Sequence, residues 1–263
     1  MTDFTAMMAG VVRAGDGWTV QVSDDWLQGR TLYGGLATAL CMQAALNQFG
    51  DLPPLRSAQV AFVGPATGAL QLRPQILRKG KSTLFAGVDL IGEAGLATRA
   101  TFCFGAARPS AFEHVAIGTP DLKLPDDCPD FFAGAPAVLR FLEHIDGRHV
   151  GGSKPFSGSD DPQMTLWLRH REPGIAASTV ALLALADAPP PAASVRSRAP
   201  LPISTMTWSI DMLTDDVATD DGWWLIRNVA EQIAGGYSSQ AMTLWNRQGR
   251  PIMASRQNVA VFG

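Results

Sequence analysis

Three residues in the second half of this 263-residue chain carry side chains that can accept a proton or hydrogen-bond a reacting group: Asp187, Thr207 and Gln257. Asp187 directly follows the apolar run Val180–Ala186, which is predicted to be helical. The helix dipole opposes a carboxylate at a helix C-terminus by about 0.3–1 kcal/mol when it is exposed. Burial makes the charge costlier still, unless hydrogen-bond donors lie nearby. A local rule broken in this way often marks a functional site, and such groups are suited to acid–base chemistry on a bound ligand.

Each of the three residues also has a purely structural explanation. Asp187 can lie past the end of its helix and cap the turn before Pro189–Pro191. Gln257 can lie on the solvent face of a strand, and threonine favours strands in general. Thr205 competes with Thr207 for the same role, because the stretch before them is short and rich in proline. The functional hypothesis therefore rests on the set rather than on any one member.

The first half of the chain has the pattern of one buried helix and several strands. Leu36–Leu46 is apolar nearly all round, which is typical of a helix buried on every face. A short strand is predicted before it. Period-two patterns separated by Gly- and Pro-containing turns predict four strands after it. The five predicted strands are Gly17–Val22, Ala58–Val63, Leu70–Leu77, Thr83–Ile91 and Leu96–Phe104.

The same order of elements returns in the second half. A helix is predicted at Ile175–Asp187, with strands at Met164–His170, Thr205–Met212, Trp223–Glu231, Ser239–Trp245 and Ile252–Phe262. The last strands of the two halves align, which sets Gln257 opposite Ala100 and Thr207 opposite Gln59.

We therefore predict an α+β protein built by internal duplication of a unit of roughly 100 residues. The two repeats are predicted at residues 1–108 and 156–263. Residues 109–155 are predicted to form a linker over the surface, with a short helical stretch at Ala137–Glu143 and no counterpart elsewhere in the chain.

Composition excludes several functional classes. Apolar residues make up 46% of the chain and charged residues 17%, so a sizeable core can form. The net charge of −3 comes without a basic stripe, which argues against nucleic-acid binding. The longest aliphatic run, Val180–Ala186, is far shorter than the roughly 18 residues that span a membrane. The first residues do not form a signal peptide, so we expect a soluble cytoplasmic protein. Three scattered cysteines and four separated histidines predict neither a disulfide nor a metal site.

Short motifs along most of the chain resemble the bacterial acyl-CoA thioesterase II family. Tyr33-Gly34-Gly35 is similar to the aromatic-Gly-Gly start of the family's first helix, and Leu77–Ser82 to its Arg-x-Gly-x-Ser turn. Leu185–Asp187, Thr207–Ser209 and Gly249–Gln257 resemble the segments that carry the family's Asp, Thr and Gln. The resemblance implies a double hot-dog fold, in which two antiparallel sheets each wrap around a buried helix.

The resemblance also implies a reaction: hydrolysis of an acyl-CoA thioester to free acid and CoA by water, without a cofactor or a covalent intermediate. Asp187 would orient and deprotonate the water, with Thr207 and Gln257 hydrogen-bonded around it. Gly34 and Gly35, at the N-terminus of the first helix, would let backbone N–H groups approach the developing oxyanion.

Three basic residues lie in the predicted turn after Leu77, namely Arg78, Lys79 and Lys81, and could meet the CoA phosphates, although a solvated turn is the better explanation for each of them singly. We further expect a homo-oligomer, a dimer or higher, that acts in lipid metabolism. Hydratase chemistry on the same fold would need an Asp and a His in one short motif, and neither predicted helix is followed by such a pair. A non-catalytic acyl-CoA-binding or scaffold protein is the remaining alternative.

Overall fold

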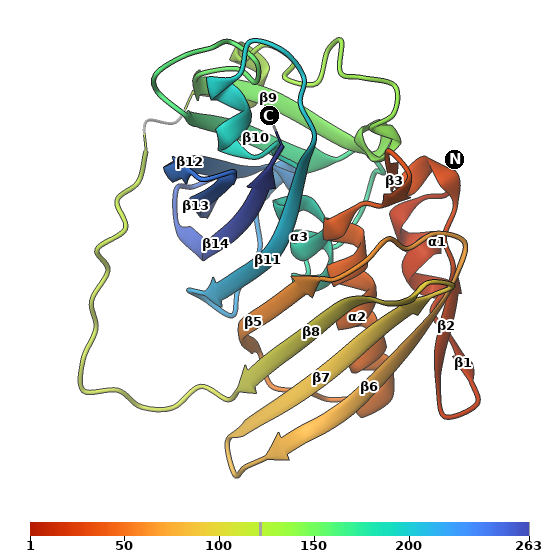
Figure 1. Ribbon diagram of the computed structural model, residues 1–263. Coiled ribbons are helices and arrows are strands. Elements are labelled where there is room, and N and C mark those ends of the chain that lie inside the picture. Colours follow the sequence, from red (N-terminus) through yellow and green to blue (C-terminus); the bar gives the residue numbers. More distant parts are fainter. Residues whose placement is uncertain (121–122, 263) are drawn as a thin grey trace.

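The computed structural model describes residues 1–120 and 123–262, and one antiparallel sheet of 12 strands runs through them (Figure 1). The strand order is β1-β2-β6-β7-β8-β5-β11-β14-β13-β12-β10-β9. The first six strands come from the first half of the chain and the last six from the second half. The two halves meet where β5 pairs with β11.

The first half contains helices α1 (Phe4–Ala9) and α2 (Gly34–Phe49), with strands β1 (Val12–Ala14), β2 (Gly17–Gln21), β5 (Leu55–Phe62), β6 (Ala69–Lys79), β7 (Thr83–Gly92) and β8 (Gly95–Gly105). A separate two-stranded sheet, β3 (Leu27–Gln28) with β4 (Thr31–Leu32), precedes α2. The second half contains helix α3 (Thr179–Ala186), with strands β9 (Ile145–Gly152), β10 (Gln163–His170), β11 (Ile203–Met212), β12 (Trp224–Ala234), β13 (Tyr237–Asn246) and β14 (Pro251–Val261).

The two halves are related by an approximate twofold axis. The strand order reads the same from either end when each strand is exchanged for its counterpart, β1 for β9 and β8 for β14. Val60 and Trp208 pair with each other across the β5–β11 junction. Val60 also pairs with Ala100, and Trp208 pairs with Gln257. The predicted alignment of Gln257 with Ala100 is therefore the alignment that the strand register gives.

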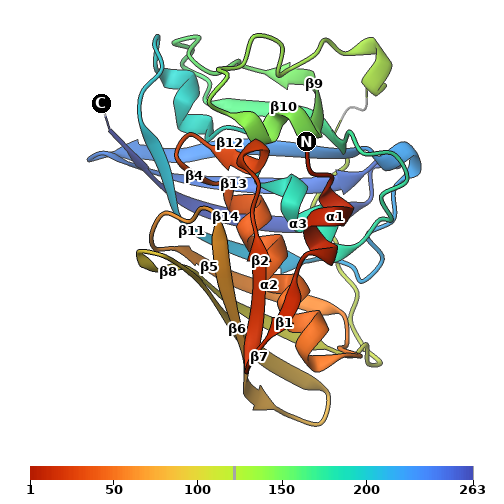
Figure 2. The ribbon, with the colours of Figure 1, turned by 90° about the vertical axis from the view of Figure 1, so that its right-hand side faces the viewer.

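Helices α2 and α3 pack against each other on the inner face of the sheet (Figure 2). Every residue from Val180 to Ala186 is buried, which explains why α3 has no polar face. The predicted double hot-dog architecture is confirmed, because each half wraps its strands around one buried helix. In the described residues no helix is both long and apolar enough to cross a membrane.

The predicted linker is partly wrong. Ile145–Gly152 forms β9, which pairs with β10 at the sheet edge and takes the place that β1 has in the first half. The predicted helical stretch Ala137–Glu143 is a 3-10 helix at Arg140–His144. The segment 106–120 does run outside the sheet (Figure 1), while residues 121 and 122 of the linker lie outside the described residues. Gly-rich β9 has little period-two patterning, so its sequence resembles a loop.

The start of the second helix also differs from the prediction. Helix α3 begins at Thr179 rather than at Ile175, because Ser178 takes the N-cap position. The Ser178 hydroxyl accepts a hydrogen bond from the Ala181 backbone N–H at 3.2 Å, and serine is among the preferred N-caps. The helix is therefore only eight residues long, and its last turn ends where Asp187 begins.

The two helices are in direct contact where α2 begins. The Tyr33 hydroxyl donates to the Ala184 carbonyl at 2.8 Å, which satisfies one of the free carbonyls at the end of α3. A Cβ added at Gly35 would lie 2.5 Å from that carbonyl oxygen and 2.5 Å from the Tyr33 ring. Gly35 is therefore required by the packing of the helices, whatever else it does.

We expect Gly35→Ala to destabilise the fold by about 1–3 kcal/mol, as overpacking of a filled core does. Thermal unfolding should show a loss of roughly 2–4 °C in Tm per kcal/mol for a chain of this size class. Gly151→Ala is the matched control, because an added Cβ there meets nothing within 4 Å. Equal Tm values for the two variants would contradict this account of Gly35.

Candidate active site

Asp187 and Gln257 meet at the end of α3. Asp187 takes the C-cap position of the helix, and Gln257 reaches it from the inner face of β14. The Gln257 side-chain N–H (Nε2) donates to Asp187 Oδ1 at 2.6 Å. Gln257 is buried, with 4% of its surface exposed, and Asp187 is partly exposed. The structure thus brings together two of the three predicted residues, and neither is a side chain that only contacts solvent.

The N-terminus of α2 lies against the other side of the Asp187 carboxylate. The Gly35 backbone N–H hydrogen-bonds Asp187. A Cβ added at Gly34 would lie 2.7 Å from Asp187 Oδ2 and 3.1 Å from the Phe62 ring. The first N–H groups of a helix have no partner within the helix and carry a partial positive charge. The carboxylate therefore has one oxygen held by Gln257 and one next to a helix N-terminus that only glycine leaves open.

Burial sets the acidity of Asp187. Desolvation raises the pKa of its carboxyl group from 3.8 to about 7, while the hydrogen bonds from Gln257 and Gly35 act in the opposite direction. A pKa near the working pH is what a general base needs, since the group must be ionised and still take a proton. Burial, with a smaller effect from the charge of Asp187, raises the pKa of Tyr33 well above 10, so the Tyr33 hydroxyl stays a hydrogen-bond donor.

Thr207 does not join the other two residues, which corrects the prediction. Trp208 pairs with Gln257 and is fully buried, so its side chain shares the inner face of the sheet. Successive side chains of a strand point to opposite faces, and Thr207 is accordingly exposed on the outer face.

Thr205 lies on the inner face instead, because β11 contains a bulge. It pairs with Val259, Thr207 pairs with Asn258, and Met206 is the extra residue between them. Val259 is fully buried two residues beyond Gln257, so Thr205 faces the same side as Gln257. A bulge shifts the face of every residue on one side of it. Sequence spacing alone therefore left Thr205 and Thr207 undecided.

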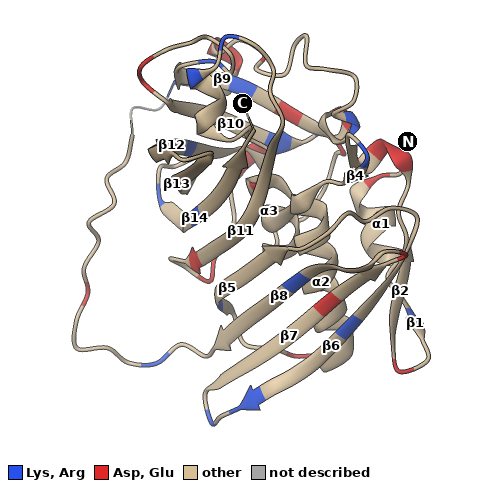
Figure 3. Ribbon diagram, in the orientation of Figure 1, with Lys and Arg blue, Asp and Glu red and all other residues tan. Residues whose placement is uncertain are grey.

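The three basic residues that are predicted to contact CoA lie far from Asp187 in the structure. Arg78 and Lys79 end β6, and Lys81 lies in the turn to β7; all three are exposed. Figure 3 shows this basic hairpin tip at the far end of the first half from α3. The structure does not bring them to Asp187 within one chain, and their contact with CoA stays a prediction.

Gln240 on β13 is a residue that the sequence analysis missed. Its side-chain N–H (Nε2) donates to Gln257 Oε1 at 2.7 Å, and its Oε1 accepts from the Ala192 backbone N–H at 2.9 Å. It is fully buried. The signal was available, because extending the alignment of the two halves to the neighbouring strand sets Gln240 opposite Val88.

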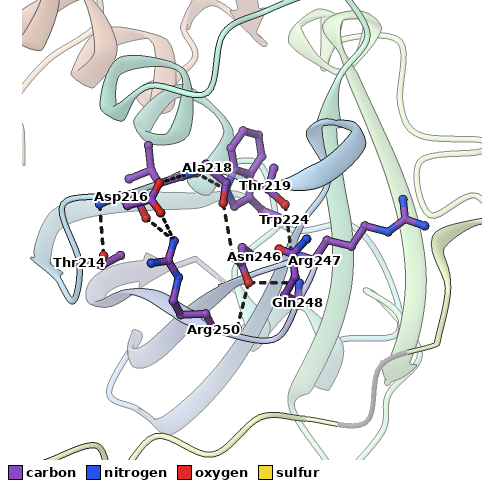
Figure 4. Close-up of polar contacts among 10 residues, drawn as sticks. Thr214, Asp216, Ala218, Thr219, Trp224, Asn246, Arg247, Gln248 and Arg250 are labelled. Atoms are coloured by element: carbon purple, nitrogen blue, oxygen red, sulfur yellow. Dashed lines mark hydrogen bonds and ion pairs between the residues drawn. The ribbon is translucent and has the colours of Figure 1, made fainter.

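A second polar cluster lies at the outer end of the second half (Figure 4). The Arg250 guanidinium contacts Asp216 at 2.7 Å, and Asn246 Oδ1 accepts from two backbone N–H groups of the β13–β14 turn. Asn246 also donates to the Ala218 carbonyl at 3.4 Å. These bonds tie the β11–β12 loop to the turn, which gives the cluster a structural role. Within the described ranges no group of His, Cys, Asp and Glu could hold a metal ion.

Comparison with known proteins identifies the family. Residues 22–105 match the family model of the acyl-CoA thioesterase N-terminal domain, and residues 125–261 match that of the acyl-CoA thioesterase C-terminal domain. The chain belongs to the acyl-CoA thioesterase family. The predicted family is thereby confirmed, and so is the predicted enzyme class, a thioester hydrolase.

Solved structures share the fold over nearly the whole chain. A hot-dog protein of unknown function from Alicyclobacillus acidocaldarius superimposes with a TM-score of 0.90 at 25% identity, covering 100% of this chain and 99% of that one. A putative thioesterase II from Thermobifida fusca gives 0.83 at 22% identity, covering 100% and 98%. The acyl-CoA thioesterase II TesB2 of Mycobacterium marinum gives 0.76 at 17% identity, covering 97% of each chain. No curated protein matches the sequence. In a thioesterase family member, the hydrogen-bonded pair of Asp187 and Gln257 is the candidate for the catalytic centre.

The raised pKa of Asp187 makes a prediction about stability. A carboxyl group that is more basic in the folded state than in the unfolded state stabilises the fold below pH 4, and this contribution is lost as pH rises to about 7. Asp187→Asn removes this dependence. We therefore expect the difference in Tm between the variant and the parent to move in favour of the variant as pH rises from about 4 to about 7. A difference that stays constant over this range would contradict a raised pKa.

Proposed function

We propose that this thioesterase hydrolyses acyl-CoA by direct attack of a water molecule, with Asp187 as the general base. The observation that carries the proposal is the asymmetry of the carboxylate: Oδ1 is held by Gln257, and Oδ2 lies against Gly34 at the start of α2. A base so placed can take a proton from a water molecule that lies between it and a carbonyl carbon near the helix N-terminus.

The hydrolysis proceeds in two steps. The water oxygen bonds to the thioester carbon while its proton passes to Asp187 Oδ2, and the carbonyl oxygen becomes an oxyanion. The positive end of α2 at Gly34 and Gly35 stabilises that charge. The carbon–sulfur bond then breaks, the sulfur leaves as the CoA thiolate, and it recovers the proton from Asp187. The products are the free acid and CoA, and the scheme needs no cofactor.

In this proposal the hydroxyl that binds the water is that of Thr205, which lies on the inner face of the sheet, and not that of Thr207. Its position beside the Gln257 row of the sheet supports a part in binding the water. Arg78, Lys79 and Lys81 keep their proposed contact with CoA phosphates. In a homo-oligomer, which we also propose, they would serve a neighbouring subunit. For an enzyme acting on acyl-CoA, we propose a role in lipid metabolism and a cytoplasmic location.

Asp187→Asn should lower kcat by about 10²-fold or more, because the variant keeps the shape and loses the base. Gln257→Ala removes an orienting hydrogen bond and should cost less, about 10–10²-fold, or about 1.4–2.7 kcal/mol. KM should change little if chemistry is slow relative to substrate release. The measurement is the release of free thiol from a panel of acyl-CoA esters.

Thr207→Ala is the matched control for this series, because its side chain lies on the outer face of the same strand; it should keep the parent activity. Full activity of Asp187→Asn together with an inactive Gln257→Ala would mean that the base is misassigned. A parent that binds CoA esters but hydrolyses none of them would support the binding-protein alternative instead.

A further inference from the structure

Three hydrogen bonds form a directed chain behind Asp187. The Ala192 backbone N–H donates to Gln240 Oε1 at 2.9 Å, Gln240 Nε2 donates to Gln257 Oε1 at 2.7 Å, and Gln257 Nε2 donates to Asp187 Oδ1 at 2.6 Å. Gln240 is fully buried and Gln257 nearly so. The two bonds that Gln240 makes are therefore shielded from competing water, where an amide hydrogen bond is strongest, and the bond from Gln257 to Asp187 is partly buried.

The direction of the chain is fixed at its far end. A side-chain amide can turn over and exchange its oxygen and nitrogen, but a backbone N–H can only donate. Ala192 therefore selects the oxygen of Gln240, which leaves the Gln240 amino group for Gln257. Gln257 must then accept from Gln240 and donate to Asp187. Because Pro189–Pro191 carry no N–H groups, Ala192 is the first backbone donor of the segment after Ala188.

The first half of the fold shows that the scaffold does not need this chain. The register pairs Gln240 with Gln257 in the second half and Val88 with Ala100 in the first half, at equivalent places on the inner face. Val88 and Ala100 are both buried. A buried amide pair costs desolvation that an apolar pair does not. The same architecture is thus built with Val and Ala where no base is present, which points to a functional reason for the two glutamines.

We propose that Gln240 is a positioning residue, which holds the amide of Gln257 in the orientation that donates to Asp187 and so leaves Oδ2 as the oxygen that takes the proton. The proposal rests on the proposed role of Asp187. Without Gln240, Gln257 is free to turn and present its oxygen to the carboxylate, an arrangement that favours the protonated acid. Loss of Gln240 should therefore raise the pKa of Asp187 even though the two residues do not touch.

Few other groups near Asp187 can change the pKa of its carboxyl group. From the start of α2, Tyr33 is the ionisable group whose own pKa responds to the charge of Asp187. From β5 the Phe62 ring lies close to Gly34, and from β14 Gln257 contacts the carboxylate; neither side chain ionises. In the described part of the chain, the hydrogen bonds that act on the Asp187 pKa are those from Gln257 and Gly35.

The test measures the pH dependence of kcat/KM and compares its acid limb in the parent and in Gln240→Met. This variant keeps the side-chain length and loses the amide. The limb should move up by about 0.5–1 pH unit, the equivalent of one lost hydrogen bond. Gln257→Leu should move it at least as far. The double variant should move it no further than Gln257→Leu does, because Gln240 acts through Gln257. Gln240→Val, which copies the residue of the first half, is the second variant if Gln240→Met does not fold.

Asn228→Leu is the matched control. Asn228 is fully buried on the neighbouring strand β12, and its amide donates to the Pro190 carbonyl at 3.2 Å. It thus holds the same segment that carries Asp187, outside the chain of amides. Asn228→Leu should lower Tm and leave the acid limb of the kcat/KM profile at the same pH. An equal shift in Asn228→Leu and Gln240→Met would overturn the proposal, because the effect would then be general loosening of the segment.

A second readout separates this proposal from the proposed function. The ¹³C shift of the Asp187 carboxyl group can be titrated without substrate in the parent and in Gln240→Met. A raised pKa in the variant supports the positioning role, even if Asp187 proves not to be the base. An unchanged pKa overturns it, even if Asp187→Asn is inactive as expected.

Discussion

The structure depends on one unfavourable contact, a carboxylate placed at the C-terminal end of a fully apolar helix. Both burial and the dipole of α3 oppose the charge of Asp187. The surrounding elements supply what offsets this cost: the N-terminus of α2, which approaches because Gly34 and Gly35 have no Cβ, and the amide of Gln257 from β14. The balance leaves the pKa of Asp187 near neutrality, where a base can act.

Duplication of the fold explains how such a site can be assembled without weakening the core. The approximate twofold axis brings two helices together in opposite sense, so that the end of α3 meets the start of α2. One copy then keeps apolar residues, Val88 and Ala100, where the other has Gln240 and Gln257. The first copy contributes backbone N–H groups and the second contributes side chains, so the site belongs to neither copy alone.

The elements that pack by hydrophobic pattern were predictable from sequence. The apolar helices, the alternating strands and the alignment of Gln257 with Ala100 follow from periodicity, which directly reflects burial. The elements that depend on contacts far apart in the sequence were not. Strand β9 is defined by its pairing with β10. Thr205 faces inward because of a bulge in the pairing of β11 with β14. The role of Gln240 depends on its hydrogen bond to Gln257 on another strand.

In the proposed reaction Asp187 activates water and does not itself attack the thioester. Isotope labelling in a single turnover tests it most directly: enzyme in excess over acyl-CoA reacts in H₂¹⁸O, and mass spectrometry then examines the free acid and the peptide that contains Asp187. Direct attack by water predicts one ¹⁸O atom in the free acid and none in Asp187. Label in the Asp187 carboxyl group, with unlabelled acid from the first turnover, would show a covalent anhydride and contradict the account.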